Sequence, residues 1–216
     1  FEFIRTLLSP LAQSRGAASL KDDVALLDSG LIVTTDTLVE GVHFLSADPL
    51  DTVGQKLVRV NVSDCIAKGA LPHQALFNLV WPTNRSDDDL HALITGLSSD
   101  LRAFDIDLIG GDTTSSPDRL VLSLTLLGRS LSDHVPRRGN ACEGDDIWVT
   151  GTIGHGVAGL RAIERNLESE FPQSVLHYRV PQLPSVEVAH LIAQHANASA
   201  DISDGLIADL ANICDA

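Results

Sequence analysis

The chain has 216 residues, of which 44% are hydrophobic and 20% charged, and its net charge is −14. This apolar content is enough for one large domain or two small ones and excludes a disordered chain. The excess of acidic groups repels nucleic acid and anionic membranes, and no apolar run reaches the ~20 residues of a membrane span. Three scattered cysteines suit a reducing compartment, and the sequence shows no signal-peptide pattern. We therefore expect a cytoplasmic protein that binds neither nucleic acid nor a membrane.

The first 132 residues predict one domain. Apolar spacing and turn signals predict, in chain order, a short helix over residues 1–11, a strand at Leu31–Thr35, a helix at Pro49–Ala70, a strand at Gln74–Trp81, a helix from Ser86 to Phe104, and strands at Leu108–Ile109 and Leu120–Leu127. Ser86 precedes three aspartates, a pattern typical of a helix cap with acids in the first turn. This order predicts an α+β fold, with a mostly antiparallel sheet in an N-terminal α/β domain over residues 1–132.

A polar segment over residues 133–144, rich in Arg and Gly, marks the domain boundary. The elements predicted beyond it are a strand at Ile147–Thr150, a helix at Val157–Asn166, a helix at Ser185–His195, a short strand ending at Asp201 and a helix from Asp204. Because these strands are so few, we expect residues 133–216 to form part of a C-terminal α/β domain that is incomplete in this sequence.

Aspartates carry the strongest functional signal, since 22 of the 29 acidic residues are Asp, the carboxylate that favours turns, caps and oxygen-ligand metal sites. They recur among small or hydroxyl residues at element ends, at Asp22-Asp23, Asp36, Asp64, Asp112, and Asp201 with Asp204. A single one of these is most simply a cap or a turn. Their recurrence predicts a magnesium and phosphate site, because clustered carboxylates repel one another unless hard cations lie between them.

This phosphate site cannot be a P-loop, because the sequence has no Gly-x-x-x-x-Gly-Lys motif and only three lysines. Charge neutralisation therefore falls to several metal ions, helped by Arg137 or Arg138. No serine or cysteine nucleophile signature is present. Among the eight histidines, His43 stands out because it follows Asp36 on the same loop. A substrate contact and a structural role both remain open for it.

A Gly-x-Gly-x-x-Gly match at residues 154–159 raises the alternative of a dinucleotide-binding protein. The surroundings do not support it, because no second parallel strand and no acidic residue at a strand end follow about twenty positions later. We prefer a tight turn whose glycines serve close packing.

Several blocks together resemble the thiamine-monophosphate kinase family, in the superfamily that includes aminoimidazole ribonucleotide synthetase. They are Lys21-Asp22-Asp23-Val24-Ala25-Leu26, Thr34 to Phe44, Asn61 to Asp64, Leu108 to Thr114, Gly144-Asp145, Val149-Thr150-Gly151-Thr152, and Asp201 to Leu206. The most diagnostic is Asp-Thr-Leu-Val-x-Gly-x-His-Phe at residues 36–44. Lys21 stands where the family has Gly. The family's Gly-Gly-Glu-Asp block and aromatic substrate wall have no counterpart before Ala216.

The resemblance implies in-line transfer of a phosphoryl group from ATP, the co-substrate, to thiamine phosphate. A related superfamily member acting on another small phosphorylated acceptor is the alternative. Metal ions and positioning would carry the reaction without a catalytic side chain. The implied ligands of several Mg²⁺ ions are Asp23, Thr34, Thr35, Asp36, Asp64, Asp112, Asp201 and Asp204. The implied ATP contacts are Gly111, Asp112, Arg138 and Ser203, and His43 would contact thiamine phosphate. The family is also dimeric, its N-terminal sheets joining in a barrel, which implies a homodimer.

Overall fold

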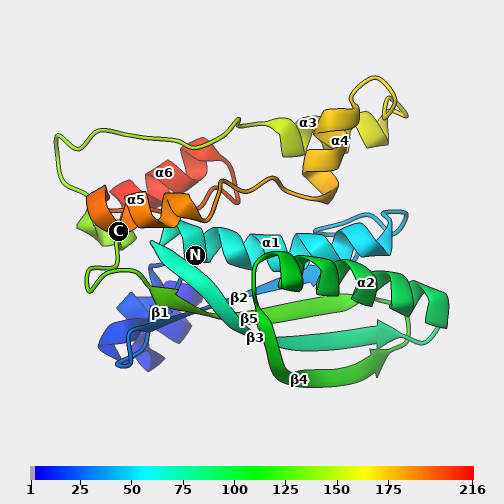
Figure 1. The fold of residues 1–216 in the computed structure, drawn as a ribbon, viewed down its shortest axis with the longest axis horizontal. Helices are drawn as coiled ribbons and strands as arrows, with labels where there is room; N and C mark the ends of the chain where they lie inside the picture. Colours follow the sequence, from blue (N-terminus) through cyan, green and yellow to red (C-terminus); the bar gives the residue numbers. More distant parts are fainter. Residues whose placement is uncertain (1–2) are drawn as a thin grey trace.

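A five-stranded sheet forms the N-terminal part of the protein in this computed structural model, which describes residues 3–216 (Figure 1). The strand order is β1-β2-β5-β3-β4, with β1 at Ala25–Leu26, β2 at Leu31–Val39, β3 at Ala70–Pro82, β4 at Asp107–Ser116 and β5 at Val121–Ser130. β3 and β4 run parallel, and the other neighbouring strands run antiparallel. The predicted α+β fold with a mostly antiparallel sheet is therefore confirmed.

Side-chain alternation gives this sheet an apolar face and a polar face. On the central strand β5, Leu122, Leu124 and Leu126 are fully buried. On the opposite face, the exposed hydroxyl groups of Thr35 and Thr37 in β2 hydrogen-bond to hydroxyl groups of β5. The apolar face is thus the one that the helices cover.

Two helices, α1 (Leu50–Ala67) and α2 (Asp87–Ala103), lie side by side on the apolar face (Figure 1). The predicted cap of α2 is confirmed: Ser86 Oγ accepts from the Asp89 backbone N–H at 3.2 Å, and Asp89 Oδ2 accepts from the Ser86 N–H at 3.1 Å. α1 ends before Gly69, whose φ of 61° suits glycine. Since α1 touches both the sheet and the C-terminal segments, residues on its last turns can meet side chains from both.

Four helices follow the sheet: α3 (His155–Glu164), α4 (Pro172–Arg179), α5 (Glu187–His195) and α6 (Leu206–Cys214). α5 packs against α1 and β3, and its Ala189 is fully buried in the same apolar core as the sheet. The division into domains at residue 133 stays a prediction, because the core continues across it.

Two strands predicted in the C-terminal part are wrong. Residues 147–150 have no strand partner among the described residues, and Ile147 and Trp148 are 69% and 89% exposed. The residues before Asp201 form a loop between α5 and α6. An apolar run becomes a strand only where a neighbour completes its hydrogen-bond ladder. The sequence analysis also missed α4, a helix of only eight residues that begins at Pro172.

The predicted opening helix is split into a π-helical turn at Ile4–Leu8 and a 3-10 turn at Ser9–Leu11 that contains Pro10. Phe1 and Glu2, which the prediction included, lie outside the described residues. Further 3-10 turns occur at Arg15–Leu20 and Arg138–Asn140. Over residues 3–216, no helix has both the length and the apolar character to cross a membrane.

Candidate metal and phosphate site

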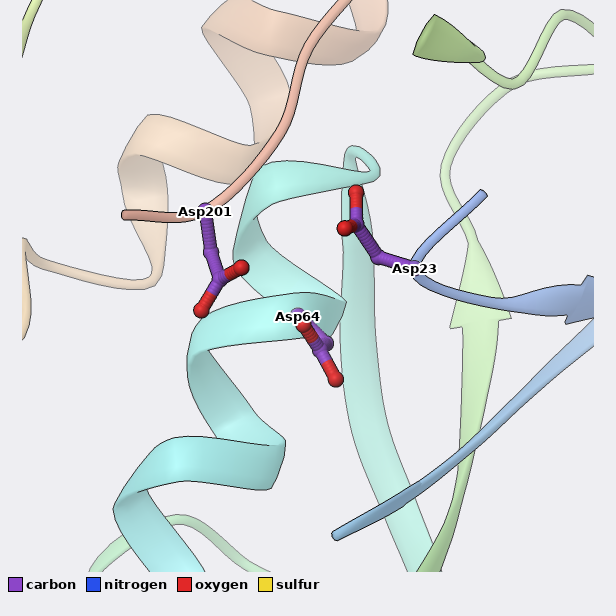
Figure 2. A group of neighbouring side chains, drawn as sticks. All are labelled: Asp23, Asp64 and Asp201. Carbon is purple, nitrogen blue, oxygen red and sulfur yellow. The ribbon is translucent and has the colours of Figure 1, made fainter. Parts of the chain in front are cut away.

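Three aspartates from distant parts of the chain meet beside α1 (Figure 2). Asp23 lies just before β1, Asp64 lies in α1, and Asp201 lies on the loop before α6. One carboxylate oxygen from each is within 4.8 Å of the others. Carboxylates this close repel one another when ionised, and a divalent cation between them removes that repulsion. We call this group the aspartate cluster.

Thr34 connects β2 to the aspartate cluster. Its Oγ1 lies 2.5 Å from Asp64 Oδ2 and 3.2 Å from the backbone oxygen of Asp23. Thr34 and Asp36 share the face of β2 that points toward α1, because side chains two residues apart in a strand lie on the same side. Burial raises the pKa of Asp36; nearby His43 lowers it and the charge of Asp23 raises it. The cluster therefore extends electrostatically to a fourth carboxyl group.

Burial and mutual repulsion disfavour the charged forms of these acids. Burial, followed by the charges of Asp201 and Asp36, raises the pKa of Asp64 to about 9. Burial, followed by the charges of Asp23 and Asp36, raises the pKa of Asp201 to about 7, although a hydrogen bond from Ser63 opposes the shift. A cation placed among them would restore ionisation, so the cluster has the electrostatics of a cation site.

Apart from Asp23 Oδ2, which is ion-paired with Lys68, two buried oxygen atoms near the cluster lack hydrogen-bond partners among the described residues. Asn61 lies one turn before Asp64 and is fully buried; its Nδ2 donates to the Leu57 carbonyl at 2.9 Å, while its Oδ1 has no partner. Asp22 Oδ2 is also buried and without a hydrogen bond. Such atoms are costly unless something binds them. Because oxygen atoms are the ligands that Mg²⁺ takes, the residues present fit magnesium.

Two cationic side chains contact the Asp22-Asp23 pair. Lys68 Nζ lies 2.5 Å from Asp22 Oδ1 and 2.8 Å from Asp23 Oδ2. Arg138 Nη2 donates to Asp23 Oδ1, whereas Arg137 Nη1 donates to the Arg15 carbonyl at 3.2 Å. Of the two arginines that the sequence left open, Arg138 is thus the one that reaches the cluster.

Asp209 shapes the loop that carries Asp201. It lies in the first turns of α6 and is 3% exposed. Its Oδ2 accepts from the backbone N–H groups of Ser203, Asp204 and Gly205 at 3.0 to 3.1 Å. Gly205 has φ of 113°, a conformation that favours glycine. A buried carboxylate therefore fixes the turn between Asp201 and α6.

His43 lies on a loop after β2 that is held from two sides. Its Nδ1 accepts from the Val39 N–H at 3.0 Å, so in the neutral ring Nε2 carries the proton and is the donor available to a ligand. Lys56 Nζ donates to the His43 carbonyl at 3.2 Å and lies 4.0 Å from the centre of the Tyr178 ring. Buried Asp48 accepts from Tyr178 Oη at 3.0 Å. The loop is thus fixed against α1 and α4.

Comparison with known proteins identifies the family. Residues 21–130 match the model of the AIR synthase related protein, N-terminal domain. Over the full length of this chain, the sequence is 38% identical to the thiamine-monophosphate kinase of Caulobacter vibrioides. The chain superimposes on the crystal structure of thiamine-monophosphate kinase from Stenotrophomonas maltophilia K279a with a TM-score of 0.77 and 32% identity, covering 96% of this chain and 71% of that one.

The chain belongs to the thiamine-monophosphate kinase family. It also matches "AaThiL complexed with AMPPCP and TMP" with a TM-score of 0.88 and 30% identity, covering 97% of this chain and 67% of that one. The chain spans 62% of the length of the Caulobacter vibrioides protein. The resemblance noted in the sequence is therefore confirmed, while the relatives are longer than this chain.

The structure places the ligands expected for a thiamine-monophosphate kinase on two faces of the sheet. Asp23, Thr34, Asp36, Asp64 and Asp201 gather on the helix-covered face. The Thr35 hydroxyl lies on the polar face, 3.1 Å from the Thr125 hydroxyl.

The clustered carboxylates do not include Asp112 or Asp204. Asp112 sits on the exposed edge strand β4, where it pairs with Asn78, and its Oδ1 accepts from its neighbour Thr113. Gly111 precedes it on the same strand. Ser203 and Asp204 lie exposed on the loop fixed by Asp209. Three strands lie between β4 and β1, and two lie between β4 and β2, so Asp112 and Gly111 of the same chain do not join the cluster.

Sequence reasoning missed two charged residues next to the aspartate cluster, Lys68 and Asp209. Both stand in otherwise apolar helical stretches, Lys68 after Cys65-Ile66-Ala67 and Asp209 within Leu206-Ile207-Ala208 and Leu210. A charge in an apolar stretch of a helix is buried with its neighbours and requires a partner. That signal was available in the sequence, although it does not name the partner.

Proposed function

We propose that the protein containing this chain is an ATP-dependent thiamine-phosphate kinase. The observation that carries the proposal is the convergence of Asp23, Asp64 and Asp201 within 4.8 Å in a chain 38% identical to a relative named thiamine-monophosphate kinase. In the proposed reaction, a phosphate oxygen of thiamine phosphate attacks the γ-phosphorus of ATP. The bond from that phosphorus to the β,γ-bridging oxygen breaks, which gives thiamine diphosphate and ADP.

Magnesium would supply charge neutralisation between the two polyanions. The residues proposed to hold several Mg²⁺ ions are Asp23, Thr34, Asp36, Asp64 and Asp201, with Thr35, Asp112 and Asp204 as further proposed ligands. The acceptor is a phosphate monoester, already mostly ionised at pH 7 because its second pKa is ~6. No side chain is therefore required as a base, and the task of the chain is to orient the two substrates.

The proposed substrate contacts use the donors described above. Arg138, which donates to Asp23, is proposed to exchange this carboxylate for a phosphate of ATP, with Ser203, Gly111 and Asp112 as further proposed ATP contacts. The Nε2–H of His43 is the donor proposed for thiamine phosphate, because Nδ1 is occupied by the Val39 N–H. Each assignment rests on the family resemblance and on the availability of the named atom.

We propose a cytoplasmic homodimer that uses strand β4. β4 is ten residues long, lies at the edge of the sheet and exposes Leu108 and Ile109. An edge strand of this length with apolar side chains is suited to pairing with another sheet. Pairing would also bring Asp112 and Gly111 of one subunit beside another chain. Light scattering or analytical ultracentrifugation tests this; a monomer at micromolar concentration would contradict it.

The decisive test is product analysis. The protein containing this chain is incubated with ATP, magnesium and thiamine phosphate, and thiamine diphosphate is measured by chromatography. Other phosphorylated acceptors are tested in parallel, since a related superfamily member would phosphorylate one of them instead. Stabilisation by nicotinamide dinucleotide without magnesium would favour the dinucleotide-binding alternative. That alternative requires a strand before the glycine motif at residues 154–159, and residues 147–150 form none in the described part of the chain.

A further inference from the structure

Lys68 is the most completely buried cationic side chain of the described chain, with 0% exposure. It follows α1 directly, at the C-cap. Its Nζ contacts two carboxylate and two carbonyl oxygens: Asp22 Oδ1 at 2.5 Å, Asp23 Oδ2 at 2.8 Å, the Ser199 carbonyl at 2.6 Å and the Pro136 carbonyl at 3.3 Å. The ammonium group thus lies where four segments of the chain meet.

Burying an ammonium group is expensive unless opposite charges and hydrogen bonds replace its water. Lys68 has both, because the carboxylates of Asp22 and Asp23 supply the opposite charge and the two carbonyl oxygens accept hydrogen bonds from its N–H groups. The Ser199 hydroxyl adds to this arrangement by donating to the Pro136 carbonyl at 3.0 Å. A set of oxygen atoms enclosing a positive centre is also the environment that a bound metal cation takes. The ammonium group of Lys68 therefore occupies a position that would otherwise suit a bound metal cation.

Asp23 connects this position to the aspartate cluster, because it contacts Lys68 through Oδ2 and is also one of the three clustered aspartates. Arg138 contacts the other oxygen of Asp23, but its side chain is 16% exposed and its buried Nε has no hydrogen-bond partner. The two cations differ accordingly. Arg138 is partly open to solvent, whereas Lys68 is fully enclosed by the protein.

We propose that Lys68 is a positioning residue and a permanent cation of the site, standing in for one of the charges that metal ions would otherwise supply. It holds Asp22 and Asp23 together before any metal binds. Its charge also repels an incoming divalent cation, so the site binds magnesium less tightly than the bare carboxylates would. This inference rests on the proposed function, since it presumes that the aspartate cluster binds magnesium.

The test compares magnesium binding by isothermal titration, and thermal unfolding with and without magnesium, in the wild type, Lys68→Met and Lys68→Gln. Met keeps the length of the side chain, and Gln keeps a donor for the carbonyl oxygens; both remove the charge. The control is Lys21→Met, which removes an exposed charge whose Nζ donates to the Ala216 carbonyl at 3.4 Å.

Both Lys68 variants are expected to bind magnesium about tenfold more tightly than the wild type, to unfold at a lower temperature without metal, and to gain more from magnesium. If a variant is unfolded without metal, millimolar magnesium is expected to restore its fold. Lys21→Met is expected to change the affinity less than about twofold, because water screens an exposed charge.

The possible results distinguish the role of Lys68 from the proposed function. Unchanged or weaker magnesium binding by both Lys68 variants, beside normal binding by the wild type, would overturn the role of Lys68 alone. So would a variant that magnesium cannot refold. A wild type that binds no magnesium in the presence of an ATP analogue would overturn the proposed function, and the role of Lys68 with it.

Discussion

Thr34 Oγ1 lies 2.5 Å from Asp64 Oδ2, and this contact joins β2 to α1 beneath the aspartate cluster. The same hydroxyl is 3.2 Å from the Asp23 backbone oxygen. With a protonated Asp64, as its raised pKa favours, the carboxyl can donate to Thr34 and the hydroxyl to Asp23. With an ionised Asp64, the hydroxyl donates to the carboxylate instead. The contact therefore persists in both protonation states, and only the direction of the proton changes.

Removing the charge of Asp64 separates its electrostatic cost from its metal-binding role. Asp64→Asn keeps an oxygen for Thr34 but removes a carboxyl group that must either stay protonated above its unfolded pKa or ionise beside Asp201 and Asp36. At pH 8 without magnesium, its Tm is expected to rise by about 3 °C or more, while the stabilisation by magnesium disappears. Differential scanning calorimetry checks both. The matched control, Asp118→Asn in an exposed turn, is expected to change neither; an unaltered magnesium response in Asp64→Asn would contradict the site.

The metal-free protein is expected to lose stability as the pH rises. Asp64 and Asp201 have pKa values near 3.8 when unfolded and about 9 and about 7 when folded. An acid whose folded pKa is raised binds its proton more tightly in the native state, so its contribution declines from about pH 4 to about pH 9. Denaturant titrations across this range, with chelator or with magnesium, measure the slope. Magnesium is expected to flatten it, and a slope indifferent to magnesium would count against the cluster.

Asp209 is expected to matter through the loop that it holds. Asp209→Ala leaves the N–H groups of Ser203, Asp204 and Gly205 without their acceptor. We expect a loss of about 2 kcal/mol, or about 4 to 8 °C in Tm, together with weaker magnesium binding, since Asp201 begins that loop. Asp215→Ala, at the exposed end of the same helix, serves as the control. Equal effects of the two variants would show that the loop does not depend on the Asp209 carboxylate.

Gly111 is required by the sheet itself. Its φ is 150°, and a Cβ at this position would lie 1.7 Å from the Phe77 carbonyl oxygen. Gly111→Ala is therefore expected to cost at least about 3 kcal/mol, measured by urea unfolding. Gly156→Ala is the control, because its Cβ would meet nothing within 4 Å and it lies in α3; we expect it to be neutral or slightly stabilising. Comparable stability of the two variants would refute the steric explanation.

The sequence predicted the elements that local patterns determine. The Ser86–Asp89 cap, the α1 helix and the strands around β5 follow from periodicity and capping residues within a few positions. The functional importance of Asp64 could also be predicted from the sequence, because an aspartate within a helix, with Asn61 on the same face, is locally unfavourable.

What the sequence could not give depends on distant partners. Residues 147–150 have the composition of a strand but no neighbour to pair with in the described chain. The oxygens around Lys68 come from residues 22, 23, 136 and 199, so no short window contains them. The opposite faces of Thr34 and Thr35 follow from alternation once β2 is known, although the family resemblance groups both as ligands.

The separation of Asp23 from Asp201 along the chain also affects the folding kinetics. These residues are 178 positions apart, so a metal ion held by both would close a loop containing most of the protein. Closing such a loop costs chain entropy before any native contact repays it. The complete ion site can therefore exist only after the sheet, α1 and the turn before α6 have docked. An ion that binds only this arrangement would therefore bind late in folding. It would slow unfolding, in which the first and last segments separate, more than it would speed folding.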